Sequence, residues 1–403
     1  MLGRLRSLMP SASFSCICTG PVATAQAYHV NTTAIREGLM EPSAASSRLT
    51  RLVRKLFIGI PNEVHRWIRG FQCLWGTDAL IVPGTGLLTD AYGLLNWGPY
   101  DMFRWTLTAK MCCCKLLFVS VGAGPIYTRF GRFCVKTALS LSDFRSYRDF
   151  STQRYLKGLG FEAGKDPICP DLAFSLSVPD IQERHFVDGH RPVVGLGLME
   201  YAGRYSVENP TAAVPSAYLW ALVEFVEWLL DRGYDLRLLS GDKVDNRVMQ
   251  EFRELLEQSG RYDASRIIHE PVRTAGHLIE QLAATDFVVA TRFHNVLLSL
   301  LLNRPSIAIS FHHKCSSLME QMELAEYCED INSLTKDRLI ATFCRLRQNE
   351  DQIRQTISKN VKACRDALNE QYGLILETIC SGGQQVALQS RVAQPKSGSS
   401  VVS

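Results

Sequence analysis

The fold of this chain follows from the stretch Asp286-Phe-Val-Val-Ala-Thr-Arg-Phe-His-Asn295. Its first five residues have almost no polar interruption, which is typical of a parallel strand buried on both faces. An apolar helical run from Val296 to Leu302 follows, and a second buried strand runs from Pro305 to Ser310. Strand, polar turn, helix and strand make a βαβ unit. Its first turn lies at the carboxyl end of the sheet, where such folds bind ligands.

Basic side chains follow both strands of this unit. Arg292 and His294 lie in the first turn, and His313 and Lys314 follow the second strand. Because the carboxyl ends of parallel strands meet at one edge of a sheet, we expect these side chains to lie together. Guanidinium and ammonium groups bind oxyanions, and a histidine exchanges protons near neutral pH. The sequence therefore predicts an anion site that contains a proton donor.

Length and composition favour a two-domain enzyme. The chain has 403 residues, 46% of them hydrophobic and 21% charged, which suffices for two cores. Its net charge of +4 is too mild to indicate a nucleic-acid partner. The 13 cysteines form neither a CxxC motif nor a zinc-type cluster, so we interpret them as reduced core residues in the cytoplasm and expect no metal. No apolar stretch is long enough to span a membrane.

The first half alternates strand and helix patterns, which predicts a doubly wound parallel sheet over residues 51–178. Gly84 and Gly86 follow its first strand, where glycines allow either close packing or an anion-binding loop. Asp90 suits an acceptor-orienting role or a solvated helix start. Arg148 suits the acceptor side or a structural ion pair with Asp149. Asp149 or Ser151 is the candidate cap of the helix that follows.

A polar segment over 179–192 is the expected linker, and a second doubly wound domain is expected over 193–345. The clearest helix of the chain runs from Ser216 to Arg232, with one apolar face at the 3.6-residue period. Arg204, after the first strand of this domain, is a candidate phosphate contact. Together the two halves predict an α/β fold of two Rossmann-like domains.

The ends of the chain carry different patterns. Residues 346–380 predict a C-terminal helix with one apolar stripe, which could close back onto the first domain. Residues 381–403 are rich in Gly, Ser and Gln and are expected to be disordered. Residues 1–50 show no sustained periodicity and are expected to form a poorly ordered extension, with a targeting segment within 1–36 as the alternative.

A succession of motifs along the chain resembles the polysaccharide pyruvyl transferase family over about residues 75–330. The motifs are Val82-Pro-Gly-Thr-Gly-Leu87, Phe118-Val-Ser-Val-Gly-Ala-Gly-Pro125, Ser146-Tyr-Arg-Asp149, Pro170-Asp-Leu-Ala-Phe174, Thr291-Arg-Phe-His294 and Ile307-Ala-Ile-Ser-Phe-His-His-Lys314. The resemblance implies two Rossmann-like domains facing a cleft, as in GT-B glycosyltransferases. It also implies transfer of a pyruvyl group from phosphoenolpyruvate to sugar hydroxyls, leaving a ketal. The chain departs from the family in lacking a Gly-rich first strand within residues 1–60.

The resemblance assigns roles to the candidate residues. His294 would deliver a proton to the vinyl carbon of phosphoenolpyruvate, and no cofactor is expected beside this donor substrate. Donor-binding roles fall to Arg292, Lys314, His313 and Arg204. Acceptor-side or loop roles fall to Gly84, Gly86, Asp90 and Arg148. The expected acceptor is a glycan or lipid-linked glycan precursor, which places the protein in the cytoplasm or peripherally at the inner face of the membrane.

Two other functions fit the same sequence. A nucleotide-sugar glycosyltransferase would need an acidic residue for the ribose, and Glu320 or Glu323 could serve. A degenerate, non-catalytic glycan-binding protein is the alternative from a different class. Substitution of His294 separates the last function from the enzymes, because only an enzyme loses turnover.

Overall fold

The computed structural model describes residues 1–36, 59–84, 86, 88–90, 98–178, 191–200, 214–241, 245–260, 263, 265–311 and 313–380. The chain divides into two compact units. Unit 1 comprises Met1–Ala12, Tyr147–Tyr155 and Ile168–Asn369, and unit 2 comprises Ser13–Ser146, Leu156–Pro167 and Glu370–Ser403. Of the expected linker over 179–192, residues 179–190 lie outside the described residues. The boundary between the units is not a single point at residue 178. Residues 147–155 and 168–178 belong to unit 1, together with most of the second half of the chain.

Within its described residues, unit 1 holds a six-stranded sheet in the order β11-β10-β9-β6-β7-β8, and all neighbouring strands run parallel. From β6 the chain adds β7 and β8 on one side and then returns to add β9, β10 and β11 on the other. The direction therefore switches between β6 and β9, which is where doubly wound sheets bind ligands. The strands are β6 (Val193–Leu198), β7 (Asp235–Ser240), β8 (Ile267–His269), β9 (Phe287–Ala290), β10 (Ser306–Ser310) and β11 (Cys328–Asp330).

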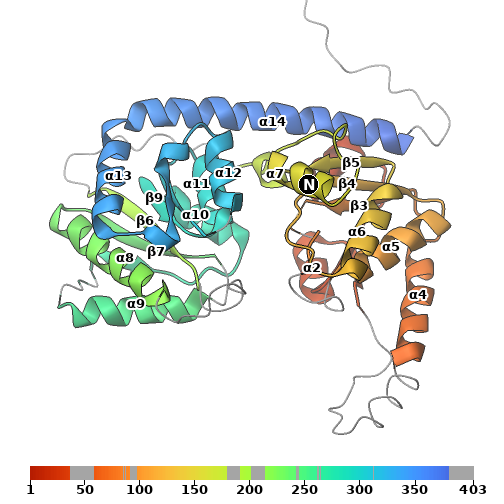
Figure 1. Ribbon diagram of the computed structural model, residues 1–403, viewed down its shortest axis with the longest axis horizontal. Coiled ribbons are helices and arrows are strands. Elements are labelled where there is room, and N and C mark those ends of the chain that lie inside the picture. Colours follow the sequence, from red (N-terminus) through yellow and green to blue (C-terminus); the bar gives the residue numbers. More distant parts are fainter. Residues whose placement is uncertain are drawn as a thin grey trace, which may run out of the picture. The chain divides into compact units, whose positions relative to one another are not determined.

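Helices cover the sheet of unit 1 in two groups (Figure 1). In the first group, α8 contacts both α9 and α13, and in the second group α11 contacts both α10 and α12. The helices are α8 (Val214–Asp231), α9 (Asn246–Gln258), α10 (Ala275–Ala283), α11 (Phe293–Leu301), α12 (His313–Gln321) and α13 (Lys336–Gln348). The ring of Phe343 on α13 lies edge-on to Phe225 of α8 and Phe287 of β9, with centroids 5.7 Å and 5.6 Å away. This aromatic contact joins the first helical group to the sheet.

Unit 2 contains a smaller sheet in the order β3-β4-β5, in which β3 and β4 run parallel. Its strands are β3 (Ala79–Pro83), β4 (Lys115–Val121) and β5 (Phe144–Tyr147), and its helices include α4 (Ile60–Leu74), α5 (Pro99–Met111) and α6 (Arg129–Ser140). α7 (Phe150–Gly158) follows β5. Oδ1 of Asp149 accepts hydrogen bonds from the Ser151 hydroxyl and from the amide of Thr152, so Asp149 is the cap of α7.

The first 36 residues differ from the expected poorly ordered extension. They form α1 (Leu2–Leu8), β1 (Ser15–Cys18), α2 (Pro21–Tyr28) and β2 (Asn31–Ala34), and β1 pairs with β2 in parallel. The next residue, Ile35, is buried, and its carbonyl accepts hydrogen bonds from Arg104 at 2.8 Å and Trp105 at 3.2 Å. The end of β2 is therefore held by distant residues of α5. The remainder of the expected extension, residues 37–50, lies outside the described residues.

The C-terminal helix α14 (Glu350–Cys380) is long, as the sequence predicts, and its apolar stripe is buried. The stripe consists of Ile353, Ile357, Val361, Cys364, Leu368, Tyr372 and Ile375. Its residues up to Asn369 belong to unit 1, and those from Glu370 belong to unit 2. In unit 2 the buried amide of Gln371 donates to Ser146 at 2.6 Å and to Ser120 at 3.0 Å. The end of α14 thus completes the core of unit 2 beside β4 and β5.

The close packing of β3 against β4 can be tested at Gly84, which follows β3. A side chain at this position would collide with β4. A Cβ atom at Gly84 would lie 2.1 Å from the carbonyl oxygen of Ser120. We expect Gly84→Ala to destabilise the protein by about 3 kcal/mol, because a backbone atom cannot move aside. Gly373→Ala is the control: this helical position is open, so alanine should stabilise by about 0.5–1 kcal/mol. Urea midpoints measure both effects, and a wild-type midpoint for Gly84→Ala would contradict the prediction.

Candidate functional site

The predicted βαβ unit is confirmed, and it brings His294 and Lys314 to one edge of the sheet. β9 pairs with β10, with Ala290 opposite Ala308. His294 lies in the first turn of α11, directly after β9, and Lys314 lies in the first turn of α12, after β10. Both therefore stand at the carboxyl ends of neighbouring strands in unit 1. The side chain of His313 lies outside the described part of the structure.

Arg148 lies in unit 1, beside the turn that carries His294, although the sequence placed it on the acceptor side. Its guanidinium stacks on the ring of Phe293, 5.0 Å from the centroid. It also contacts Asp171 at 3.3 Å and Asp149 at 3.4 Å. Arg148 is thus both a structural ion-pair partner and a neighbour of the predicted proton donor.

Arg292 forms a two-pronged ion pair with Asp245, a residue that sequence reasoning did not single out. Its Nε donates to one carboxylate oxygen at 2.9 Å, and its Nη2 donates to the other at 2.5 Å. Asp245 is 0% exposed and precedes α9, and it also accepts from the amide of Glu200 at 3.1 Å. A Cβ atom at Gly241 would lie 2.9 Å from Cγ of Arg292, so the glycine makes room for the pair. Arg292 is therefore oriented by a buried carboxylate.

The surroundings of His294 favour its neutral form. Burial lowers the pKa of His294; Asp171 opposes this effect, and Arg148, Lys314 and Arg292 add to it. Water nevertheless reaches the side chain, so the direction of this pKa shift rests on the cationic neighbours as well as on burial. An anion bound among these cations would offset them and raise the pKa of His294.

Lys314 is a half-buried cation, and among the described residues none forms an ion pair with it. Burial lowers the pKa of Lys314, Arg148 lowers it further, and Asp149 and Asp171 partly compensate. At Asp149, burial raises the pKa, but hydrogen bonds from Ser151 and Thr152 and the charge of Arg148 outweigh it, so this pKa is lowered. Both acidic neighbours of Lys314 already bind Arg148.

The other predicted site residues have structural partners or lie elsewhere. Asp90 is buried in unit 2 and accepts hydrogen bonds from the amides of Tyr127 and Thr128 and from the Thr128 hydroxyl, at 2.7–2.9 Å. This supports its role at the start of α6 rather than at an acceptor. Gly84 is accounted for by its close approach to β4, and the role of Gly86 stays a prediction. Arg204 lies outside the described residues.

Buried polar groups lie beneath the same sheet edge. Asn295 is 0% exposed, and neither its amide nitrogen nor its amide oxygen has a hydrogen-bond partner among the described residues. Beside it, the hydroxyl of Tyr218 shares a 2.8 Å hydrogen bond with Thr291, and burial raises the pKa of Tyr218 to about 12. In the part of the chain that the structure describes, no cluster of three or more metal-ligating side chains occurs. None of the described helices is long and apolar enough to cross a membrane.

Known structures share the architecture of this chain. A glycosyltransferase from Rickettsia africae superposes with a TM-score of 0.54 at 11% identity, covering 93% of this chain and 92% of that chain. UDP-GlcNAc 2-epimerase from Neisseria meningitidis, bound to UDP-GlcNAc, gives 0.55 at 10% identity, with 92% of each chain covered. HepE of Anabaena, in complex with UDP and glucose, gives 0.51 at 13% identity, with 88% of each chain covered. The predicted GT-B-like fold of two Rossmann-like α/β domains is confirmed.

Sequence comparison then identifies the family. The sequence model of the polysaccharide pyruvyl transferases matches residues 4–313, and this chain belongs to that family. The amylovoran biosynthesis protein AmsJ of Erwinia amylovora is 24% identical over 328 residues, which cover 75% of this chain and 73% of AmsJ. The resemblance seen in the motifs is confirmed, and the match begins within the N-terminal segment that the sequence left unassigned.

The contribution of the ion pair between Arg292 and Asp245 to folding can be measured directly. Arg292→Ala leaves a buried carboxylate without its cation, so we expect a loss of about 3 kcal/mol in the free energy of unfolding. Adding Asp245→Asn removes that charge and should recover part of the loss. Urea denaturation of both single variants and the double variant measures the coupling. Strictly additive losses would show that the pair contributes nothing to folding.

Proposed function

We propose that this chain transfers the pyruvyl group of phosphoenolpyruvate onto two hydroxyls of a sugar in an exopolysaccharide precursor, leaving a cyclic ketal and inorganic phosphate. The supporting observation is a proton-exchanging histidine beside a half-buried lysine that forms no ion pair with a described residue. Family membership supports a transferase of polysaccharide biosynthesis. The chemistry of the donor is our inference from the charges around His294.

Recognition of the donor requires cations for both a phosphate and a carboxylate. Lys314 supplies a point charge, and its lowered pKa reflects an environment in which a bound anion is favourable. Arg148 and Arg292 are held by carboxylates, so their orientations are set before the donor arrives. Such preorganisation reduces the entropy lost on binding.

The reaction begins when protonated His294 gives its proton to the vinyl methylene carbon, which becomes a methyl group. The neighbouring carbon acquires oxocarbenium character and forms a bond to a sugar hydroxyl oxygen, whose proton returns to His294. The carbon–oxygen bond to phosphate then breaks, and its electron pair leaves with the phosphate. A second hydroxyl closes the ketal, and its proton is taken up by the departing phosphate. The cations around His294 stabilise the negative charge of the leaving group.

The lowered pKa of His294 suits this cycle. Without donor, the histidine is largely neutral, whereas the trianionic donor raises its pKa and loads the proton that the first step needs. When the charged phosphate departs, the pKa of His294 falls again. The donor therefore controls the protonation of the group that activates it.

The function is tested by donor specificity and by loss of the histidine. Phosphoenolpyruvate should raise the melting temperature of the protein, and UDP- and GDP-sugars should not. With hexose glycosides that carry neighbouring free hydroxyls, the protein should release phosphate. His294→Gln should lower kcat by about 10²–10⁴-fold while retaining the melting shift.

His277→Gln, at an exposed histidine on α10 of the same unit, is the matched control and should keep wild-type turnover. Stabilisation by UDP- or GDP-sugars alone would overturn the proposal in favour of a nucleotide-sugar glycosyltransferase. Glycan binding without phosphate release would favour a non-catalytic binding protein.

The charge balance around His294 predicts a pH effect. Asp171 raises the pKa of His294, so Asp171→Asn should lower that pKa below the wild-type value. As a general acid, His294 is active when protonated, so kcat/KM should fall as pH rises through its pKa. In Asp171→Asn this fall should move to lower pH.

Titration of His294 by NMR in the absence of donor measures the pKa shift directly. Asp337→Asn, at an exposed position of α13, removes the same charge at a distance and should leave the titration of His294 unchanged. An equal or higher pKa of His294 in Asp171→Asn would show that Asp171 does not act on the histidine.

A further inference from the structure

A groove of about 570 Å³ on unit 2 runs along the exposed face of α6. It is lined by Arg129, Arg132, Phe133, Lys136, Thr137, Ser140, Leu141 and Leu159. The α6 residues recur at spacings of three and four, so they share one face of the helix. The opposite face is buried and contains Gly131, Cys134, Val135, Ala138 and Leu139. α6 is therefore anchored by one face and presents cations on the other.

Aromatic rings stand beside these cations in solvent. Phe130 is 48% exposed and Phe133 is 56% exposed, and their ring centroids are 6.5 Å apart. Phe130 also stacks on Tyr100 of α5 at 6.2 Å, and Phe133 lies 5.9 Å from Phe103. Because α5 holds the rings from behind, their outer faces form a fixed apolar surface rather than scattered contacts.

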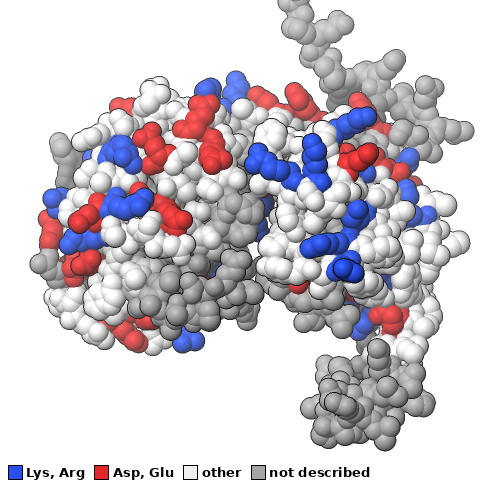
Figure 2. Space-filling view, viewed as in Figure 1, with Lys and Arg blue, Asp and Glu red and all other residues white. Residues whose placement is uncertain are grey.

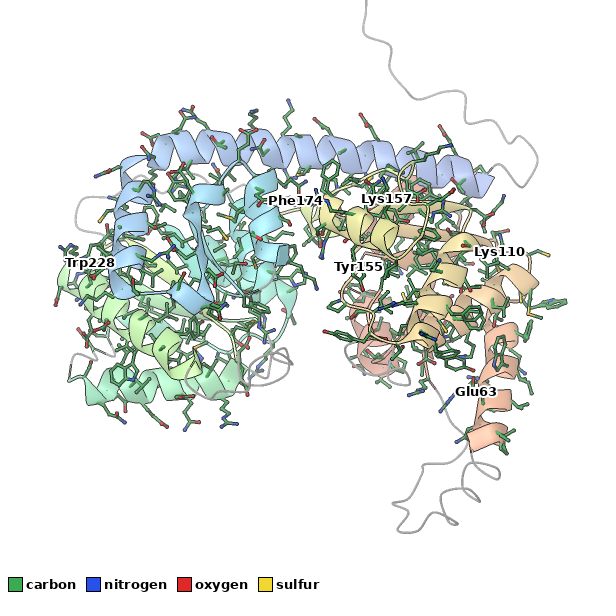
Figure 3. All side chains as sticks on the ribbon, viewed as in Figure 1. Glu63, Lys110, Tyr155, Lys157, Phe174 and Trp228 are labelled. Carbon is green, nitrogen blue, oxygen red and sulfur yellow. The ribbon has the colours of Figure 1, made fainter. Side chains whose placement is uncertain are left out.

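The charge of this surface is positive. Figure 2 shows Lys and Arg side chains gathered over the region that α6 occupies in Figure 1. Among the described residues that line the groove, none is acidic. A Cβ atom at Gly160 would lie 3.7 Å from Nζ of Lys136, so this lysine reaches the turn after α7. Lys157, labelled in Figure 3, is exposed on α7 two residues before the groove residue Leu159.

We infer that this α6 surface of unit 2 binds the anionic phospholipid headgroups of a membrane. Arg129, Arg132 and Lys136 contact headgroup phosphates, and the rings of Phe130 and Phe133 enter the interfacial layer. Cations next to exposed aromatic rings match a membrane surface, where phosphate lies directly above an apolar layer. A small soluble phosphate would use the cations and leave the rings in water. The inference stands apart from the donor chemistry, since vesicle binding needs no substrate.

The test is sedimentation of the full chain with vesicles of phosphatidylcholine, with and without phosphatidylglycerol. Wild type should bind the anionic vesicles, bind neutral ones far more weakly, and dissociate as salt rises. The triple variant Arg129→Glu, Arg132→Glu, Lys136→Glu should lose more than about a hundredfold in affinity, because each basic group contributes about fivefold and each glutamate adds repulsion from the anionic lipid. Phe130→Ala with Phe133→Ala should lose several-fold and make the residual binding more sensitive to salt.

A matched triple variant, Arg232→Glu, Lys359→Glu, Lys362→Glu, makes the same charge change at exposed positions of unit 1 and should bind like wild type. If the α6 triple variant does not fold, Arg129→Gln with Lys136→Gln keeps the Arg132 bond to the carbonyl of Ile126 and should lose about 25-fold. Equal binding to neutral and anionic vesicles, or equal losses in both triple variants, would overturn the inference. So would binding of inorganic pyrophosphate by the wild type without binding to vesicles.

Discussion

The ion pair between Arg292 and Asp245 holds the turn that carries the candidate site. Asp245 follows β7 and Arg292 follows β9, so the pair closes over the end of β6 between them. Asp245 precedes α9 without capping it, because its carboxylate is used by the arginine and by the amide of Glu200. A buried carboxylate is tolerated only with such partners. The identity of Arg292 is therefore set by the fold as well as by any ligand, two residues before His294.

The cations next to this pair differ in how many carboxylates they contact, and this difference favours the binding of an anion. Arg148 is shared between Asp149 and Asp171, whereas Lys314 forms no ion pair with a described residue. The lowered pKa values of Lys314 and His294 are consequences of burial among cations. An anion bound here would relieve both penalties at once, so the proposed function links protonation of His294 to binding of a phosphate. A donor with two acidic groups matches this arrangement better than a neutral sugar does.

Local patterns were sufficient for most of the fold. The strands predicted over 286–290 and 305–310 and the helices predicted over 216–232 and 346–380 match β9, β10, α8 and α14 to within a few residues, because uninterrupted apolar runs and one-sided stripes are local signals. Local patterns did not predict the strands before Arg36, because these short strands depend on the distant side chains of Arg104 and Trp105. The site followed the same rule. His294 and Lys314 were found from strand ends, whereas Asp245 and the contact of Arg148 with Phe293 required the tertiary structure.

Asn295 shows that this sheet edge is not optimised for stability alone. Its amide is fully buried and lacks partners among the described residues, which costs about 1–3 kcal/mol for each unsatisfied group. A Cβ atom at Gly197 would lie 2.7 Å from its nitrogen, so β6 has a glycine where a larger residue would displace the amide. An apolar residue of similar shape would remove the polar penalty without changing the packing. Polar groups that are retained at a topological switch point are typically there for ligand binding. The cations around His294 also indicate a ligand site at this edge of the sheet.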